Sequence, residues 1–157
     1  VSSLRVHGQT KRYYHKYIGI GGRIDALQAA VLNVKLKYYA QDIVSRQSVA
    51  KLYDEFIGDS FIKPHILSNN TSVWAQYSIR VKDREKVQQH LSKKGIPTSI
   101  HYPIPLHLQE CFKYLGYSKG AFPVAEKISN EIISLPMNPY LSTKEIEYIS
   151  FNLRTTN

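Results

Sequence analysis

The chain has 157 residues, of which 43% are hydrophobic and 21% charged, and its formal net charge is +9. These values are typical of a folded domain and exclude a disordered chain, a collagen and a coiled coil. No apolar run approaches the roughly 20 residues of a membrane span, and we expect no signal peptide. The single cysteine excludes an internal disulfide and predicts a reducing, cytoplasmic location. The only methionine is Met137, which indicates processing or a fragment of a longer chain.

The positive charge admits several kinds of partner. Basic residues occur in small groups, such as Lys11 with Arg12 and Lys93 with Lys94, and form no continuous block. Dispersed charge of this kind is most often a solvated surface. Binding of a nucleic acid or of a phosphorylated small molecule stays open.

The first part of the chain predicts a loop followed by a long helix. Residues 1–22 show no period and end in a glycine-rich run at 19–22. Residues 23–57 contain no Pro or Gly, and Gly58 stands where a C-terminal cap belongs. Apolar side chains recur along this helix in two stripes: Ile24, Leu27, Val31, Val34 and Tyr38, then Val49, Leu52 and Phe56 beside Ala50, Tyr53 and Ile57. We therefore expect the two halves of the helix to pack on different cores.

The second part predicts alternating strands and helices. Residues 72–82 alternate apolar and polar side chains, as a half-buried strand does. Asp83 is a suitable N-cap for a short helix that ends at Gly95. An extended run follows over residues 96–102 and ends at Pro103.

Helices dominate the C-terminal third. A short helix is predicted over 106–117, and a second begins at Pro123 with Ile132 on its apolar stripe. After an extended link, Ser142 and Glu145 form the capping box of a last helix.

These elements predict two parts. Residues 1–58 would be a loop and a long connecting helix, and residues 59–157 a small α+β domain with about three strands. The second part could fold alone, but the first half of the helix finds no partner within it.

The glycine-rich run is suited to binding an anion. Glycines at 19, 21 and 22 allow close approach, a helix N-terminus offers free N–H groups, and Arg23 adds a bidentate donor. The spacing matches neither a Walker loop nor a dinucleotide fingerprint. A plain glycine turn before a helix is the alternative.

A second candidate site lies between the predicted strand at 96–102 and the next helix. His101, Tyr102 and His107 flank Pro103 and Pro105, which stiffen the loop and hold the side chains for a ligand. The spacing of the two histidines fits no standard metal site, so no metal is expected. The alternative is an exposed capping loop.

The sequence gives little support for other kinds of catalytic site. Cys111 lies in a predicted helix and is expected to be buried rather than nucleophilic. No acidic pair resembles a glycosidase dyad, and no serine lies in a nucleophile elbow.

Taken in order, the motifs resemble the C-terminal part of DegT/DnrJ-type sugar aminotransferases. The resemblance extends along nearly the whole chain and is carried by these residues: His7, Gly8 and Gln9; Arg12, Tyr13 and His15; Gly19, Gly21 and Arg23 through Ala30; Gly95, Ile96 and Pro97; His101, Tyr102 and Pro103; Pro105, Leu106 and His107; Ala125 and Glu126; and Ser134, Leu135, Pro136 and Met137.

The resemblance implies a fold type I α/β enzyme that depends on pyridoxal phosphate and works as a homodimer. The large domain, with the lysine that holds the cofactor, precedes the matching stretch and is absent here. This chain would then hold the small C-terminal α+β domain and the connecting helix, with no catalytic residue of its own, and would be inactive alone.

The resemblance also assigns roles to residues. Gly19, Gly21, Gly22 and Arg23 would border the cofactor phosphate, although Gly21 stands where the family usually has Asn. The substrate would be bordered by Arg12, Tyr13, His15, His101, Tyr102 and His107.

The implied reaction passes an amino group from glutamate to a keto group of a UDP- or dTDP-linked sugar. The motifs look most like members that act on UDP-linked keto sugars for polysaccharide or glycan synthesis. Neither nucleic acid nor membrane is an expected partner. Two alternatives remain: a free-standing basic α+β module that binds an anion or nucleic acid, and a structural remnant that only dimerises.

Overall fold

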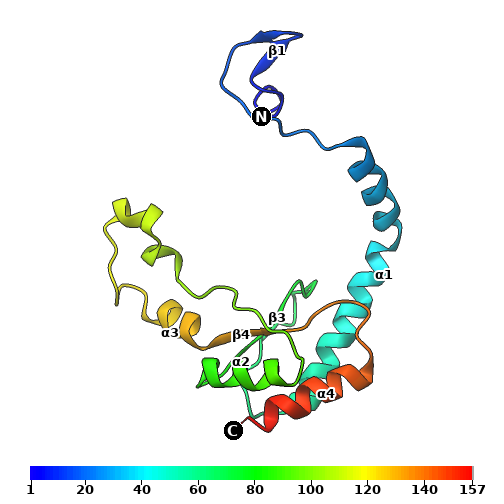
Figure 1. Cartoon of the computed structure of the whole chain (residues 1–157), viewed down its shortest axis with the longest axis vertical. Coiled ribbons are helices and arrows are strands. Elements are labelled where there is room, and N and C mark those ends of the chain that lie inside the picture. The colour runs from blue at the N-terminus through cyan, green and yellow to red at the C-terminus, as the bar shows by residue number, and fades with distance from the viewer. Residues whose placement is uncertain (157) are drawn as a thin grey trace. The chain divides into compact units, whose positions relative to one another are not determined.

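The computed structural model describes residues 1–156, which form short strands and longer helices (Figure 1). In chain order the elements are β1 (Gln9–Lys11), β2 (Tyr14–His15), α1 (Ala26–Ile57), β3 (Tyr77–Arg80), α2 (Arg84–Lys93), the 3-10 helices η1 (Leu106–Leu108) and η2 (Glu110–Leu115), α3 (Pro123–Glu131), β4 (Ile132–Leu135) and α4 (Thr143–Arg154). The chain divides into two compact units at Ala40, within α1. The predicted domain division was placed at the end of that helix and stays a prediction.

The first unit contains a small hairpin. Strands β1 and β2 pair antiparallel, and a second antiparallel bridge joins Val6 to Gly21. Around that bridge the His7 amide donates to the Ile20 carbonyl at 3.0 Å. The glycine-rich run is therefore paired with the residues that precede the hairpin.

Helix α1 begins at Ala26, three residues later than the sequence predicts. The Asp25 carboxylate accepts a hydrogen bond from the Leu27 amide at 2.8 Å, which satisfies one of the free N–H groups of the first turn. All the buried residues of this helix lie in its second half: Val49, Ala50, Tyr53 and Ile57. The apolar side chains of its first half, including Leu27 and Val31, are exposed in the described residues.

The second unit is built on a two-stranded antiparallel sheet. Strand β3 pairs with β4 in the register Tyr77 to Leu135 and Ile79 to Ile133. Helices α2 and α4 contact each other, as Figure 1 shows. The core consists of apolar side chains from α1, β3, α2, β4, α4 and the segments that follow β3 and α2: Val49, Ala50, Tyr53, Ile57, Tyr77, Ile79, Val81, Val87, Leu91, Ile96, Ile133, Leu135, Ile146, Ile149 and Leu153.

Several predicted elements need correction. The strand predicted over 72–82 is regular only from Tyr77 to Arg80, and Trp74 before it has a positive φ of 48°. Two 3-10 helices replace the helix predicted over 106–117, and neither contributes a residue to the buried core. Cys111 in the second of them is exposed, so its predicted burial is wrong.

The sheet also differs from prediction. Ile132 begins strand β4 instead of ending a helix, because the whole segment pairs with β3 and Ile132 itself lies opposite Arg80. The run at 96–102 joins the sheet through one bridge, Ser99 with Ser134. No helix in the described part of the chain is long and apolar enough to cross a bilayer.

Candidate functional site

The predicted site residues lie in both compact units. The glycine-rich run, Arg12, Tyr13 and His15 belong to the first unit, and His101, Tyr102 and His107 to the second. The structure brings residues together within each of these two groups.

In the first unit, the glycines are needed for close packing. A Cβ at Gly19 would overlap the backbone of Gly8, which itself has a positive φ of 73°. A Cβ at Gly21 would come within 3.1 Å of the His7 ring, so glycine leaves room for that imidazole.

The backbone amides of the glycine-rich run differ in whether they already donate a hydrogen bond. The Gly22 amide donates to the Arg5 carbonyl at 2.8 Å and is engaged. The Gly21 amide has no acceptor among residues 1–156, because its bridge to Val6 is of the non-hydrogen-bonded kind. Helix α1 starts only at Ala26, so the run does not lie at the helix N-terminus as predicted.

Arg12, Tyr13 and His15 lie on the hairpin. The Arg12 guanidinium sits 5.1 Å from the centroid of the Tyr13 ring, and Tyr13 has a positive φ of 68° at the turn. The Nδ1 atom of His15 lies 2.9 Å from the His7 carbonyl, which fixes that imidazole against the preceding segment. All three side chains are exposed.

The second unit contains a cavity of about 1020 Å³ formed by residues 101–122 and one face of α3. His101, Tyr102 and His107 all line it, together with aromatic side chains that include Tyr117 and Phe122. Three residues that the sequence predicts as substrate-binding therefore line the same cavity.

His101, which lines the cavity, contacts a serine that is itself paired with a second serine. Its Nδ1 atom lies 2.9 Å from the Ser134 Oγ, and the Ser134 Oγ lies 2.7 Å from the Ser78 Oγ. Ser134 is 4% exposed, so this hydroxyl pair is shielded from water. Sequence analysis did not predict these two serines as site residues, because they lie on paired strands that only the fold brings together.

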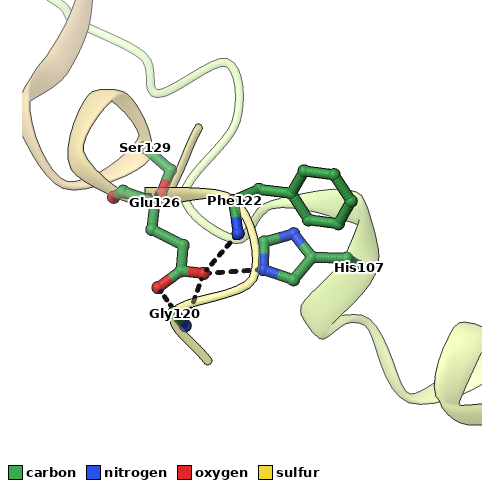
Figure 2. Close-up of polar contacts among 5 residues, drawn as sticks. All are labelled: His107, Gly120, Phe122, Glu126 and Ser129. Atoms are coloured by element: carbon green, nitrogen blue, oxygen red, sulfur yellow. Dashed lines mark hydrogen bonds and ion pairs between the residues drawn. The ribbon is translucent and has the colours of Figure 1, made fainter. Parts of the chain in front are cut away.

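His107 contacts a carboxylate that sequence reasoning did not single out as a site residue. Its Nε2 atom lies 2.9 Å from Glu126 Oε1, and the Phe122 ring packs against the imidazole with centroids 4.8 Å apart (Figure 2). The same carboxylate accepts hydrogen bonds from the Gly120 amide at 2.8 and 3.0 Å. Glu126 therefore joins η1, the loop before α3 and α3 itself.

The pKa of the Glu126 carboxyl reflects opposing effects. Burial raises this pKa, but the hydrogen bonds from His107 and from the Gly120 and Phe122 amides together hold it below its ordinary range. The carboxylate is consequently ionised at neutral pH and acts only as an acceptor. Within residues 1–156, no group of His, Cys, Asp and Glu could hold a metal ion.

Comparison with known proteins identifies the fold of this site. The profile of the DegT/DnrJ/EryC1/StrS aminotransferase family matches residues 1–154. The chain belongs to this family. It matches the structure of a family aminotransferase from Brucella abortus with a TM-score of 0.86 and 38% identity, covering 98% of this chain and 42% of that one. The architecture is therefore that of part of an α/β aminotransferase.

Two curated relatives carry specific names. One is the UDP-2-acetamido-2-deoxy-3-oxo-D-glucuronate aminotransferase of Pseudomonas aeruginosa, 44% identical over 150 residues that cover 95% of this chain and 41% of the relative. The other is the dTDP-3-amino-3,6-dideoxy-alpha-D-galactopyranose transaminase of Aneurinibacillus thermoaerophilus, 39% identical over 93% of this chain and 40% of the relative. The chain thus spans about two fifths of the length of these relatives.

Members of this aminotransferase family generally depend on pyridoxal phosphate. The residues of this chain fit one part of that cofactor. The Gly21 amide, unengaged among the described residues, and the exposed Arg23 guanidinium suit its phosphate group.

Proposed function

We propose that this chain is the C-terminal part of a pyridoxal-phosphate-dependent nucleotide-sugar aminotransferase of fold type I. In the whole enzyme, an amino group would pass from glutamate to a keto group of a UDP- or dTDP-linked sugar used for polysaccharides or glycans. One observation carries this proposal: the 44% identity over 150 residues to the relative named for a UDP-linked 3-oxo sugar. The dTDP alternative is supported by the second relative.

The cavity of the second unit would receive part of the substrate. Ligand pockets commonly have volumes of about 300–1,000 Å³, and the cavity of about 1020 Å³ is at the upper end of this range. His101, Tyr102 and His107 would orient the substrate, since each places a polar group on a largely apolar wall. An extended ligand with a ring at one end and hydroxyls along its length matches such a lining.

The hairpin and glycine-rich run of the first unit would supply cationic and amide donors. Arg12 suits a diphosphate, because a guanidinium binds phosphate oxygens through two parallel bonds. Tyr13 and His15 would contact the same substrate. Gly19, Gly21, Gly22 and Arg23 would border the cofactor phosphate, with the Gly21 amide and the Arg23 side chain as donors. When bound, pyridoxal phosphate supplies the electron sink for the amino transfer.

The chain alone should be inactive, since the resemblance places the cofactor lysine in a segment outside these 157 residues. The test combines the chain with a separately produced large domain of a family member. We expect the combination, given pyridoxal phosphate, to develop the visible absorbance of lysine-bound cofactor and to consume glutamate when a UDP-linked keto sugar is present. The matched control is the same large domain with its cofactor lysine changed to Ala. Amino transfer by the chain alone, or the same turnover with the control, would contradict the proposal.

Assembly and location are further proposals. We propose a homodimer in which both subunits border each site, and a cytoplasmic location. Sedimentation of the combined polypeptides tests the dimer, which predicts two copies of each polypeptide in the active species.

A further inference from the structure

We propose that Glu126 is a positioning residue that fixes His107 as its Nε2–H tautomer and so presents the Nδ1 atom of that ring to the cavity as a hydrogen-bond acceptor. The tautomer and its cause follow from the geometry of this chain. The ligand that Nδ1 would meet rests on the proposed function.

The contact between the two side chains is close and shielded. His107 Nε2 lies 2.9 Å from Glu126 Oε1, and the side chains are only 8% and 14% exposed. Water therefore has little access to replace either partner. A shielded contact of this kind holds a ring orientation more firmly than a surface pair would.

The carboxylate is itself fixed from three other directions. The Gly120 amide donates to both of its oxygens, at 2.8 and 3.0 Å, and the Phe122 amide donates to Oε1 at 3.4 Å. Glu126 also lies in the first turn of α3, where the helix dipole stabilises a negative charge. Figure 2 shows these donors converging on the carboxylate.

This arrangement decides where the proton of the neutral imidazole lies. An ionised carboxylate can only accept, so the ring nitrogen that faces it must carry hydrogen. The proton is therefore on Nε2, and Nδ1 keeps its lone pair. Rotating the ring by half a turn would place a carbon against Glu126 and lose the bond. The Phe122 ring contacts the imidazole in an edge-to-face arrangement, with the two planes inclined by 61°.

The ring that carries the free nitrogen lines the cavity. His107 lines the cavity, and within residues 1–156 its Nδ1 atom has no hydrogen-bond partner. An acceptor on this wall would take a neutral O–H or N–H donor from a ligand. Under the proposed function the matching groups are the hydroxyls of the nucleotide sugar.

The tautomer can be tested on the 157-residue chain without any ligand. In ¹⁵N and ¹³C NMR spectra above the pH at which the ring becomes neutral, we expect His107 to give the signals of a single Nε2–H tautomer. In Glu126→Gln, whose amide can either accept from or donate to Nε2, we expect a mixture of the two tautomers. A wild-type ring in the Nδ1–H form, or a mixture in the wild type, would overturn the proposal whatever the variants do.

Glu110→Gln is the matched control, since it removes the same charge from an exposed glutamate in the 3-10 helix that follows His107. Glu110 is exposed and contacts only Lys113, at 3.4 Å. We expect the His107 signals to be unchanged in this variant. A pure Nε2–H tautomer in a folded Glu126→Gln protein would show that Glu126 does not position the ring.

The ligand contact is tested with the chain combined with a large domain and a UDP-linked sugar as the probe. We expect Glu126→Gln to weaken binding about five- to tenfold, as the misorientation of one hydrogen bond predicts. The effect should vanish in a His107→Ala background, because Glu126 acts through that ring. Equal weakening in both backgrounds would overturn the positioning role. Failure of the wild type to bind the sugar, with the tautomer results intact, would overturn the proposed function and leave the positioning role supported.

Discussion

Tyr53 of α1 and Tyr77 of β3 stack on each other in the core of the second unit, with ring centroids 4.8 Å apart and planes inclined by 25°. Both rings are fully buried, and both hydroxyls are satisfied. Tyr53 donates to the Pro136 carbonyl at 2.8 Å, and Tyr77 donates to the Asp54 carboxylate at 2.6 Å. The pair therefore ties the second half of α1 to the end of the sheet where β3 begins and β4 ends.

Tyr77→Phe should destabilise the second unit by about 1–3 kcal/mol, because the Asp54 carboxylate loses its buried donor. The measurement is urea unfolding followed by tryptophan fluorescence. Tyr140→Phe is the matched control, since Tyr140 is exposed and its hydroxyl makes no hydrogen bond among the described residues. An unfolding midpoint for Tyr77→Phe equal to that of the control would show that the bond contributes nothing.

The two buried tyrosines also predict alkaline instability. Burial raises the pKa of both phenols, and for Tyr77 the hydrogen bond to Asp54 raises it further. A raised folded-state pKa gives stability that is full below the unfolded value of about 10 and is lost as pH rises above it. We therefore expect the midpoint of urea unfolding to fall above pH 10, and to fall less steeply in Tyr77→Phe. A midpoint that stays level to pH 11 would contradict this.

The cap of α4 gives a third prediction. The Ser142 Oγ accepts from the Glu145 amide at 3.3 Å, and the Ser142 amide donates to Glu145 Oε2 at 2.8 Å. Ser142→Ala should cost about 1 kcal/mol in unfolding free energy. Ser118→Ala, on an exposed loop, is the control and should cost nothing measurable.

Acid should weaken the same cap. The bonds from the Ser142 hydroxyl and amide lower the pKa of Glu145. A lowered folded-state pKa gives stability that is present above the unfolded value and is lost as pH falls through the folded one. We expect the loss in acid to be smaller in Ser142→Ala than in the wild type, and parallel unfolding curves for the two would contradict this.

This cap shows what sequence alone could predict. Ser142 and Glu145 are three residues apart, so the motif is local, and the structure confirms it. The strand Ile132–Leu135 was missed because its partner, β3, lies more than fifty residues earlier in the chain. A run of four residues with three apolar side chains fits the end of a helix as well as a strand, and only the pairing decides.

The same limit applies to the candidate sites: residues in local motifs can be predicted from the sequence, and contacts between distant segments cannot. Motif order placed His101, Tyr102 and His107 together, and the structure puts them on one cavity. Motif order could not predict that Glu126 contacts His107 or that Ser134 contacts His101. These contacts depend on the path of residues 101–122 and on strand pairing. The helix expected from Arg23 begins at Ala26, and the glycine-rich run before it is paired with residues 4–7 instead of lying at the helix N-terminus.

The serine pair that contacts His101, Ser134 with Ser78, gives a further prediction. Ser134→Ala removes the hydroxyl that contacts both His101 and Ser78, so it should cost about 1–2 kcal/mol in unfolding free energy. Ser78→Ala should cost less, because the contact with His101 remains. In the double variant the loss should fall short of the sum, since the two serines share one contact. Strict additivity in urea unfolding would show that the hydroxyls act independently.

Two glycines with nearly the same backbone angle allow the last prediction. Gly8 has a φ of 73° and Gly116 a φ of 76°. An alanine at either position should therefore lower the unfolding free energy by about 1–2 kcal/mol, because its side chain disfavours the left-handed conformation. Their surroundings differ: a Cβ at Gly116 meets nothing within 4 Å, whereas one at Gly8 would overlap the Tyr17 carbonyl.

Gly8→Ala should therefore separate the segments that meet at Tyr17, while Gly116→Ala should show only the conformational cost. The readout is amide exchange of Lys16, whose N–H donates to the Gly8 carbonyl at 2.9 Å. We expect this amide to exchange much faster in Gly8→Ala and at the wild-type rate in Gly116→Ala, because Gly116 lies in the other compact unit. Unchanged exchange in Gly8→Ala would show that the close contact of the two backbones is not required for the hairpin, and that glycine at this position serves only its positive φ.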